Sequence, residues 1–344
     1  MGPLDTFQRP LGSLRLSVTD RCNLRCGYCM PEEEYTWLPK RELLSFEELT
    51  RVVRATADLG VSKVRLTGGE PLLRRDLERL VADLAALPHV TDLALTTNAV
   101  LLEDQAAGLH AAGLTRLSIS LDTLRADRFE HMTRRKDLGR TLAGIAAARR
   151  AGFVGTKLNT VVVRGENDDE VFDLLEFART EELEVRFIEY MDVGGATRWN
   201  MGAVLSAREL LARLAARYGA IEPIESEPSA PADRFRLPDG LVFGVIASTT
   251  QPFCGTCDRA RVTADGRFFT CLYAREGLAL APLLRGEGDQ AARDARVAEA
   301  LRERWTVRAD RGAEARLALA TRDPLAAAAE LRRDPHLEMH TRGG

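Results

Sequence analysis

The stretch "LRLSVTDRCNLRCGYCMP" (residues 14–31) joins a short strand-like run to a loop that carries three cysteines. Cys22, Cys26 and Cys29 follow the spacing C-x3-C-x2-C. A disulfide uses two thiols, and a structural zinc site uses four ligands. Three clustered thiols therefore indicate a metal site whose remaining ligand comes from elsewhere.

Length and charge limit the class of protein. The 344 residues are 45% apolar, enough for one large domain or two smaller ones. The net charge of −3 disfavours a protein dedicated to nucleic acid or to a membrane surface, because such proteins usually carry a basic excess. No run approaches the roughly 18 apolar residues of a membrane span, and the N-terminus lacks the regions of a secretory signal. We expect a cytoplasmic protein, in which clustered cysteines are more often metal ligands than disulfides.

A repeating βα rhythm surrounds the first cysteines. Strand-like runs occupy residues 14–19, 63–67, 92–97, 116–121, 157–163 and 184–190. Amphipathic segments near 46–59, 74–87, 102–112, 138–151 and 168–180 lie between them, and several end at a glycine suited to a helix C-cap. Six such units predict an α/β fold with a parallel sheet, arranged as a partial (βα)6 TIM-like barrel because a closed barrel needs eight.

The rhythm changes after residue 225. Residues 225–240 are rich in proline, acid and glycine and are interpreted as a connection. Strands are predicted at 241–248, 259–264 and 267–273, with a hairpin turn at 264–266, followed by a helix near 289–304. We therefore predict a barrel over 1–225 and a C-terminal α+β extension over 226–344.

The first three cysteines favour an iron–sulfur cluster over zinc. Thiolates are the usual protein ligands of such clusters. A cubane of four irons held by Cys22, Cys26 and Cys29 leaves one iron free for a substrate or cofactor. Zinc with a distant fourth ligand stays an alternative, although no histidine is close in sequence.

This cysteine loop, together with "LTGGEP" (residues 66–71), resembles the radical S-adenosylmethionine enzymes. The resemblance implies a [4Fe–4S] cluster on the three cysteines, with S-adenosylmethionine on the open iron. The bound pair generates a 5′-deoxyadenosyl radical, so the cysteines count as catalytic. The residues that would contact this cofactor are Tyr28, Gly69, Glu70, Ser120 and Met191.

The second group of cysteines also supplies three thiols, one fewer than the four ligands of a structural zinc site. Cys254, Cys257 and Cys271 have no histidine nearby, and no second C-x2-C pair completes a zinc ribbon. A second three-cysteine cubane fits this pattern better.

Basic residues accompany both groups of cysteines. Arg259 and Arg261 share one face of a strand, because they are two positions apart. Arg15, Arg65 and Lys157 lie on other predicted strands. Each alone is most simply a solvated or paired side chain, but together they favour an anion such as a triphosphate.

The motifs together resemble the GTP 3′,8-cyclase family, radical enzymes of the first step of molybdenum cofactor biosynthesis. They are "LRLSVTDRCNLRCGYCMP", "LTGGEPLLRRDL", "LTTN", "SISLD", "RFIEYMD", "FCGTCDRARVTADGRFFTCL" and the final glycine pair. The departure is Ala99, where the family usually has glycine. The resemblance implies that a hydrogen leaves ribose C3′ of GTP and that C3′ then bonds to C8 of guanine. Reduction and protonation complete the product.

The same resemblance assigns further residues and partners. GTP is expected to contact Arg15, Arg65, Thr96, Lys157, Arg259, Ala260 and Arg261, with its base on a second [4Fe–4S] cluster. Gly343 and Gly344 are expected to reach the active site as catalytic residues. A flavodoxin- or ferredoxin-like reductant and a cyclic pyranopterin monophosphate synthase are the implied partners, and a homodimer is left open.

Two alternatives are weighed against this interpretation. One is another radical S-adenosylmethionine enzyme with an auxiliary cluster, such as a peptide-modifying one. The other is a non-catalytic metal-binding or redox-sensing module, which explains neither the incomplete ligand counts nor the motifs at strand ends.

Overall fold

The structure, a computed structural model, describes residues 2–343 and is built on one twelve-stranded sheet. Six parallel strands form its centre. They are β1 (Ser13–Ser17), β2 (Lys63–Thr67), β3 (Asp92–Thr97), β4 (Arg116–Ser120), β5 (Lys157–Val162) and β6 (Glu184–Glu189). They lie side by side in chain order, so the predicted parallel α/β arrangement is confirmed.

The alternation of side chains along the strands separates the core from the interior of the barrel. Leu14 and Leu16 of β1 are fully buried among apolar side chains, as are Val64 and Leu66 of β2. Successive side chains of a strand point to opposite faces. The residues between these leucines and valines therefore face the inside, where polar groups gather.

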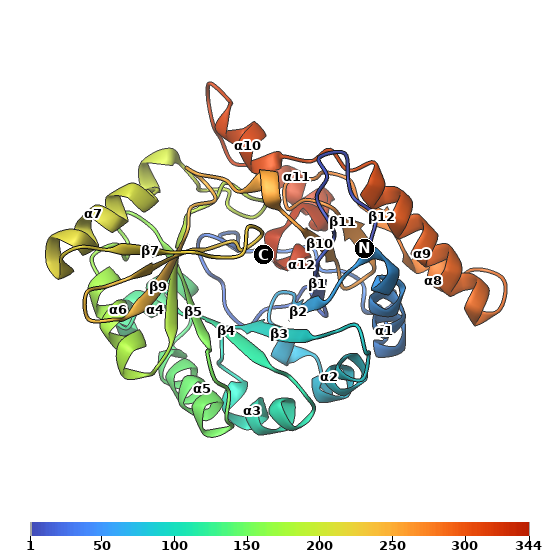
Figure 1. The fold of residues 1–344 in the computed structure, drawn as a ribbon, viewed down its shortest axis with the longest axis horizontal. Coiled ribbons are helices and arrows are strands. Elements are labelled where there is room, and N and C mark those ends of the chain that lie inside the picture. The colour runs from blue at the N-terminus through green and yellow to red at the C-terminus, as the bar shows by residue number, and fades with distance from the viewer. Residues whose placement is uncertain (1, 344) are drawn as a thin grey trace.

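Helices cover the outer face of the sheet (Figure 1). The predicted ones are α1 (Phe46–Ala55), α2 (Leu77–Ala85), α3 (Leu102–Ala111), α5 (Leu138–Arg150) and α6 (Val171–Thr180). The chain turns in the left-handed conformation at Gly60, Gly113 and Gly152, as predicted. The predicted start of α2 at 74 was wrong, because Arg74 is extended and Asp76 has a φ of 58°.

Two helices beside the barrel were not predicted. They are α4 (Ala126–Thr133) and α7 (Ala207–Tyr218). The start of α7 carries a capping box, in which Ser206 and Glu209 bond each other's backbone amides. That signal is present in the sequence, whereas α4 has no side-chain cap.

The C-terminal strands extend the same sheet at both edges. β9 (Val242–Ile246) pairs parallel to β6, and β10 (Arg259–Val262) pairs parallel to β1. Antiparallel strands follow outside them: β7 (Glu222–Ile224) and β8 (Asp233–Arg236) beside β9, and β11 (Arg267–Phe269) and β12 (Leu278–Ala279) beside β10. The interpretation of 225–240 as a plain connection was wrong, because it contains β8. The hairpin turn at 264–266 is confirmed, and the division at residue 225 stays a prediction.

The chain from residue 281 to residue 343 is mostly helical. It forms α8 (Ala281–Arg285), α9 (Gln290–Thr306), α10 (Gly312–Leu317), α11 (Ala328–Arg333) and α12 (Met339–Arg342). Figure 1 shows α9 outside α1, whereas α12 returns to the middle of the ring of strands. Within residues 2–343, no helix has the length and apolar character needed to cross a membrane.

Candidate active site

Both groups of cysteines line one cavity of about 950 Å³. Cys22, Cys26 and Cys29, the first cysteine set, come from the loop after β1. Cys254, Cys257 and Cys271, the second cysteine set, come from the segments around β10 and β11. All six thiols are free, and none is fully exposed. Two sets separated by more than 200 residues therefore share one reaction space.

The thiols of the first cysteine set are held in an apolar setting. Burial, followed by the charge of Glu70, raises the pKa of Cys22 to about 11. Burial raises the pKa of Cys26 and of Cys29 well above the usual value. Free thiols in such a setting stay protonated without a positive partner, and a bound metal cluster is one partner that would ionise them.

The glycines of "LTGGEP" allow the second strand to approach the cysteine loop. Gly69 donates its amide hydrogen to the carbonyl of Thr19 at 2.9 Å. A Cβ atom at Gly69 would stand 2.3 Å from the carbonyl oxygen of Arg21, closer than atoms can approach. Any side chain here would push the cysteine loop away, so this glycine is required by packing.

Glu70 is buried at the end of the same turn. Its carboxylate accepts hydrogen bonds from the Thr97 hydroxyl and the Asn98 amide, both at 2.7 Å, and from the Leu72 amide at 3.1 Å. Burial raises its pKa to about 7 in spite of these donors. A carboxylate so placed gains from a cationic ligand in the cavity.

Tyr28 is anchored by its hydroxyl group. It donates a hydrogen bond of 2.8 Å to Asp122, whose other oxygen accepts from the Val161 amide. Burial raises the pKa of Asp122 to about 6. The ring of Tyr28 lines the cavity, as do Ser120 and Met191.

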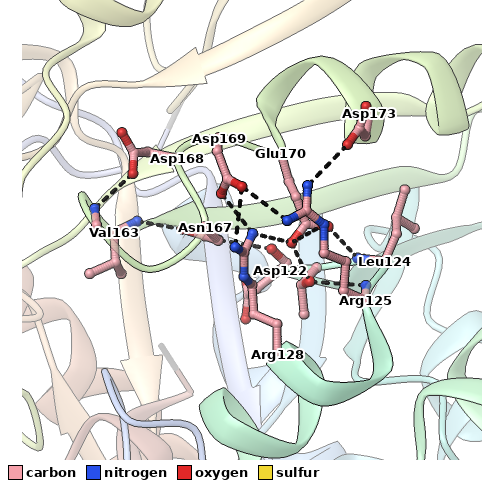
Figure 2. Close-up of polar contacts among 12 residues, drawn as sticks. Asp122, Leu124, Arg125, Arg128, Val163, Asn167, Asp168, Asp169, Glu170 and Asp173 are labelled. Carbon is pink, nitrogen blue, oxygen red and sulfur yellow. Dashed lines mark hydrogen bonds and ion pairs between the residues drawn. The ribbon is translucent and has the colours of Figure 1, made fainter.

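A polar network behind Asp122 fixes this wall (Figure 2). Asn167 donates to the carbonyl oxygens of Asp122 and Val161 at 2.8 and 2.9 Å. The buried Glu170 accepts from the amide of Leu124 at 2.9 Å and from the side chain of Arg128. No local sequence pattern predicts this support, because its members belong to different βα units.

The second cysteine set has a different electrostatic setting. Burial opposes ionisation of Cys257, but the charges of Arg259 and Arg308 outweigh it and lower the pKa to about 7. The Tyr273 amide donates to the Cys271 sulfur at 3.5 Å. Donors aimed at sulfur suit thiolates that hold a metal cluster. In the part of the chain described, no three His, Cys, Asp or Glu side chains are grouped as ligands of a single metal ion.

Three arginines stand in register across three adjacent parallel strands. Arg15 of β1 is the partner of Arg65 on one side and of Arg261 on the other. Burial and the charges of its arginine neighbours lower the pKa of Arg15 well below its usual value. Burial and then Arg116 lower the pKa of Arg65 to about 10, while burial and then Arg259 do the same for Arg261. The row concentrates positive charge on one wall.

Lys157 of β5 lines the same cavity and stands in register with Ser118, whose hydroxyl accepts from Arg65 at 2.9 Å. Burial, followed by the charge of Arg186, lowers the pKa of Lys157 to about 7. Burial alone disfavours the charged form of a lysine, and the arginines around Lys157 add to that effect.

Among residues 2–343, none of these cations has a carboxylate within ion-pair distance. We call these five residues the unpaired cations: Arg15, Arg65, Lys157, Arg259 and Arg261. Arg116 and Arg186 line the same cavity but are paired with Asp92 and Glu184. Buried cations without a counter-ion are costly, so the unpaired cations call for an anionic ligand.

The remaining predicted residues divide between the cavity and the core. Thr96 lines the cavity and accepts from Arg65 at 3.4 Å. The side chain of Ala260 instead lies in the hydrophobic core, since it alternates with Arg259 and Arg261. Gly343 accepts a hydrogen bond from Arg15 at 3.1 Å, whereas Gly344 lies outside the described residues.

Several cavity residues were not predicted as ligands. Asn98 and His340 line the cavity. Asn98 lies within the "TTN" motif, which was a usable signal, and it donates to Asn23 of the cysteine loop at 2.7 Å. His340 comes from α12, and only the fold brings that tail to the cysteine loop.

Comparison with known proteins agrees with this geometry. The Radical SAM superfamily profile matches residues 16–178, and that of Molybdenum Cofactor Synthesis C matches 183–313. GTP 3′,8-cyclase 3 of Mycobacterium bovis is 53% identical over 99% of this chain and 90% of its own length. GTP 3′,8-cyclase of Acidothermus cellulolyticus is 50% identical over 91% of this chain and 88% of its own length. The structure of Streptococcus suis SuiB bound to S-adenosylmethionine has a TM-score of 0.59 at 16% identity. It covers 90% of this chain and 68% of SuiB, and it shows similarity of fold alone.

Proposed function

Because the chain belongs to the GTP 3′,8-cyclase family of radical S-adenosylmethionine enzymes, we propose that it cyclises GTP. The product is (8S)-3′,8-cyclo-7,8-dihydroguanosine 5′-triphosphate, formed in the first step of molybdenum cofactor biosynthesis. One observation carries this proposal: a single cavity holds both cysteine sets and the unpaired cations.

The first cysteine set would hold a [4Fe–4S] cluster. The donor set fits, because three free thiols face the cavity beside a glycine turn that leaves no room for side chains. With S-adenosylmethionine bound and one electron supplied by an external reductant, such a cluster would supply the 5′-deoxyadenosyl radical chemistry that removes hydrogen from ribose C3′. Glu70 would accept a hydrogen bond from the ammonium group of that cofactor, beside the backbone of Gly69.

Other side chains shape the same half of the cavity. Ser120 and Met191 would contact S-adenosylmethionine from the ends of β4 and β6. Tyr28, held by Asp122, would cover the ligand with its ring. Fixed groups of this kind hold the reactive carbon against one hydrogen, and orientation of this type dominates selectivity.

The second cysteine set would hold a second [4Fe–4S] cluster in the same cavity. Three thiols with amide and guanidinium donors directed at sulfur fit such a group. We expect the guanine base of GTP to bind beside the second cysteine set.

The unpaired cations would bind the triphosphate. Arginine presents paired N–H donors that match phosphate oxygens, and Lys157 adds a point charge. The free Nε–H groups of Arg259 and Arg261 are buried and lack a partner among the described residues. Thr96 adds a hydroxyl beside Arg65. Ala260 would contribute only its backbone, because its side chain is in the core.

The glycine tail would close the phosphate end of the cavity. Gly343 lies against Ser17 and Thr67 and accepts from Arg15. We propose that Gly343 and Gly344 keep the arginine row oriented toward the substrate while excluding water. A cytoplasmic reductant of flavodoxin or ferredoxin type and a cyclic pyranopterin monophosphate synthase would act before and after this step.

Iron and acid-labile sulfide in anaerobically prepared protein test this assignment. The expected result is about eight irons per chain, falling to about four in Cys22→Ala and in Cys271→Ala. Each variant should lose GTP cyclisation completely. Zinc in place of iron, or no loss of iron from Cys271→Ala, would contradict the two-cluster site.

A further inference from the structure

Three buried arginines lie behind the second cysteine set, and each donates a hydrogen bond to a backbone carbonyl at or next to one of its cysteines. We call them the backing arginines: Arg9, Arg308 and Arg342. The bonds run from Arg9 Nη1 to the carbonyl of Cys254 at 2.7 Å, from Arg308 Nη1 to that of Cys257 at 2.8 Å, and from Arg342 Nη1 to that of Leu272 at 2.8 Å. Leu272 directly follows Cys271, so the pattern is one arginine for each cysteine.

The backing arginines come from distant parts of the chain. Arg9 precedes β1, Arg308 follows α9, and Arg342 ends α12. Their exposed fractions are 2%, 4% and 1%. Folding brings three guanidinium groups out of water to one place, which is unfavourable unless they are compensated there.

The compensation from carboxylates is incomplete. Asp5, which is buried, lies 2.6 Å from Arg9 and 3.4 Å from Arg308. Asp310 is partly exposed and lies 3.9 Å from Arg308. Arg342 instead stacks over the ring of Phe269 at 4.1 Å and has no carboxylate within ion-pair distance among residues 2–343. Positive charge is therefore in excess behind these cysteines.

The first cysteine set has the opposite surroundings. Arg25 donates to the carbonyl of Cys22 at 2.8 Å. Two buried carboxylates lie beside this loop: Asp122 accepts from the Tyr28 hydroxyl at 2.8 Å, and Glu70, which lines the cavity with Cys22, accepts from the Asn98 amide at 2.7 Å. Charge close to an iron–sulfur cluster is one of the factors that set its reduction potential.

We propose that the backing arginines position the second cysteine set and raise the reduction potential of the cluster bound there. The inference rests on the proposed function, because it takes that cluster as present. A backbone held by three separate guanidinium groups keeps the spacing of the thiols. Their charge stabilises the reduced, more negative state of the cluster. Residues that support ligands from outside in this way commonly change metal affinity 10–100-fold when removed.

The experiment isolates the second cluster in the full-length chain. The parent protein carries Cys22→Ser, Cys26→Ser and Cys29→Ser, so that all remaining iron belongs to the second set. Arg308→Met removes the charge and the bonds to Cys257 and Asp5 while keeping an apolar stem. Arg308→Lys keeps the charge. Arg51→Met is the matched control, because Arg51 also binds one carboxylate, Asp294, and one carbonyl, Leu284, away from the cavity.

Iron content, loss of iron to a chelator and a redox titration followed by electron paramagnetic resonance are measured. In Arg308→Met we expect a more negative potential and iron loss about ten times faster than in the parent. Arg308→Lys should keep a potential close to the parent, and Arg51→Met should match the parent in every respect. A purely structural role of Arg308 would not make the reduction potential depend on whether residue 308 is charged, so this comparison separates the two roles.

Other outcomes overturn the inference. Unchanged potential and iron loss in Arg308→Met would do so, as would an equal change in Arg51→Met. If circular dichroism shows that Arg308→Met does not fold, the rate of iron loss is measured in Arg9→Lys and Arg308→Lys instead. Iron loss at the rate of the parent protein in both variants would overturn the positioning role. If the parent protein binds no iron, the second cluster is absent and the proposed function fails. This result differs from failure of the inference alone, in which the parent binds iron but the arginine variants do not differ from it.

Discussion

The guanidinium of Arg15 donates a hydrogen bond of 3.1 Å to the carbonyl of Gly343, although 328 residues separate them. Arg15 also stands in register between Arg65 and Arg261. The tail is thereby tied to the middle of the arginine row. The position of the tail and the orientation of the arginine row therefore depend on each other.

Gly343→Ala tests this connection. The residue has a φ of 66°, and a Cβ atom would stand 2.1 Å from Thr67 Cγ2, so the tail cannot keep its place. We expect turnover to fall on the order of 100-fold, as for displacements of about 1 Å in other sites. Iron content should not change. Gly165→Ala is the control, since it has a φ of 80° with nothing within 4 Å. Equal losses in both variants would contradict a specific role for the tail.

Lys157 makes GTP affinity depend on pH. Its pKa is about 7 in the free protein, so it loses its proton as pH rises above that value. A bound phosphate raises the pKa again, and linkage then requires GTP to bind more weakly as pH rises from 7 to 9. Binding is measured anaerobically without turnover. Lys157→Arg should remove most of the dependence, because arginine keeps its charge. An identical slope in that variant would refute the assignment.

Glu70→Gln should weaken the binding of S-adenosylmethionine. Both carboxylate oxygens accept bonds from N–H or O–H donors, so the amide group of glutamine meets a donor it cannot pair with. We expect at least about a tenfold loss of affinity and a cost of about 1–3 kcal/mol in stability. Calorimetric binding and thermal unfolding measure the two effects. Wild-type affinity would exclude Glu70 from the cofactor site.

Asp192 connects the barrel to the C-terminal segments. It is fully buried and pairs with Arg316 and Arg322, and it accepts from the hydroxyl of Tyr273 at 3.0 Å. Asp192→Asn leaves two arginines without their charge partner and should cost about 3–5 kcal/mol of unfolding free energy. Asp239→Asn, which breaks the more exposed pair with Arg179, should cost less than about 1 kcal/mol. Similar losses in denaturant unfolding would refute this account of Asp192.

Local patterns in the sequence were enough to predict the six central strands and both cysteine sets. The alternation of Leu14, Arg15 and Leu16 is visible without a structure, and so is the spacing of Cys22 and Cys26. Such signals lie within a few residues of one another. They also predicted that cations would face the interior.

Contacts between distant segments could not be predicted in the same way. That β10 pairs parallel with β1, and thereby brings Arg261 beside Arg15, depends on where the whole C-terminal region packs. The backing arginines and the bond between Tyr28 and Asp122 likewise join residues far apart in sequence. The family resemblance placed the glycine tail near the active site, but only the fold identified Arg15 as its partner.

The most direct test of the central claim is anaerobic turnover of GTP deuterated at ribose C3′ in the presence of S-adenosylmethionine and a strong reductant. The account predicts that deuterium appears in 5′-deoxyadenosine and that the 3′,8-cyclised triphosphate forms in equal amount. Formation of 5′-deoxyadenosine without deuterium, or of no cyclised product by protein that carries both clusters, would contradict it.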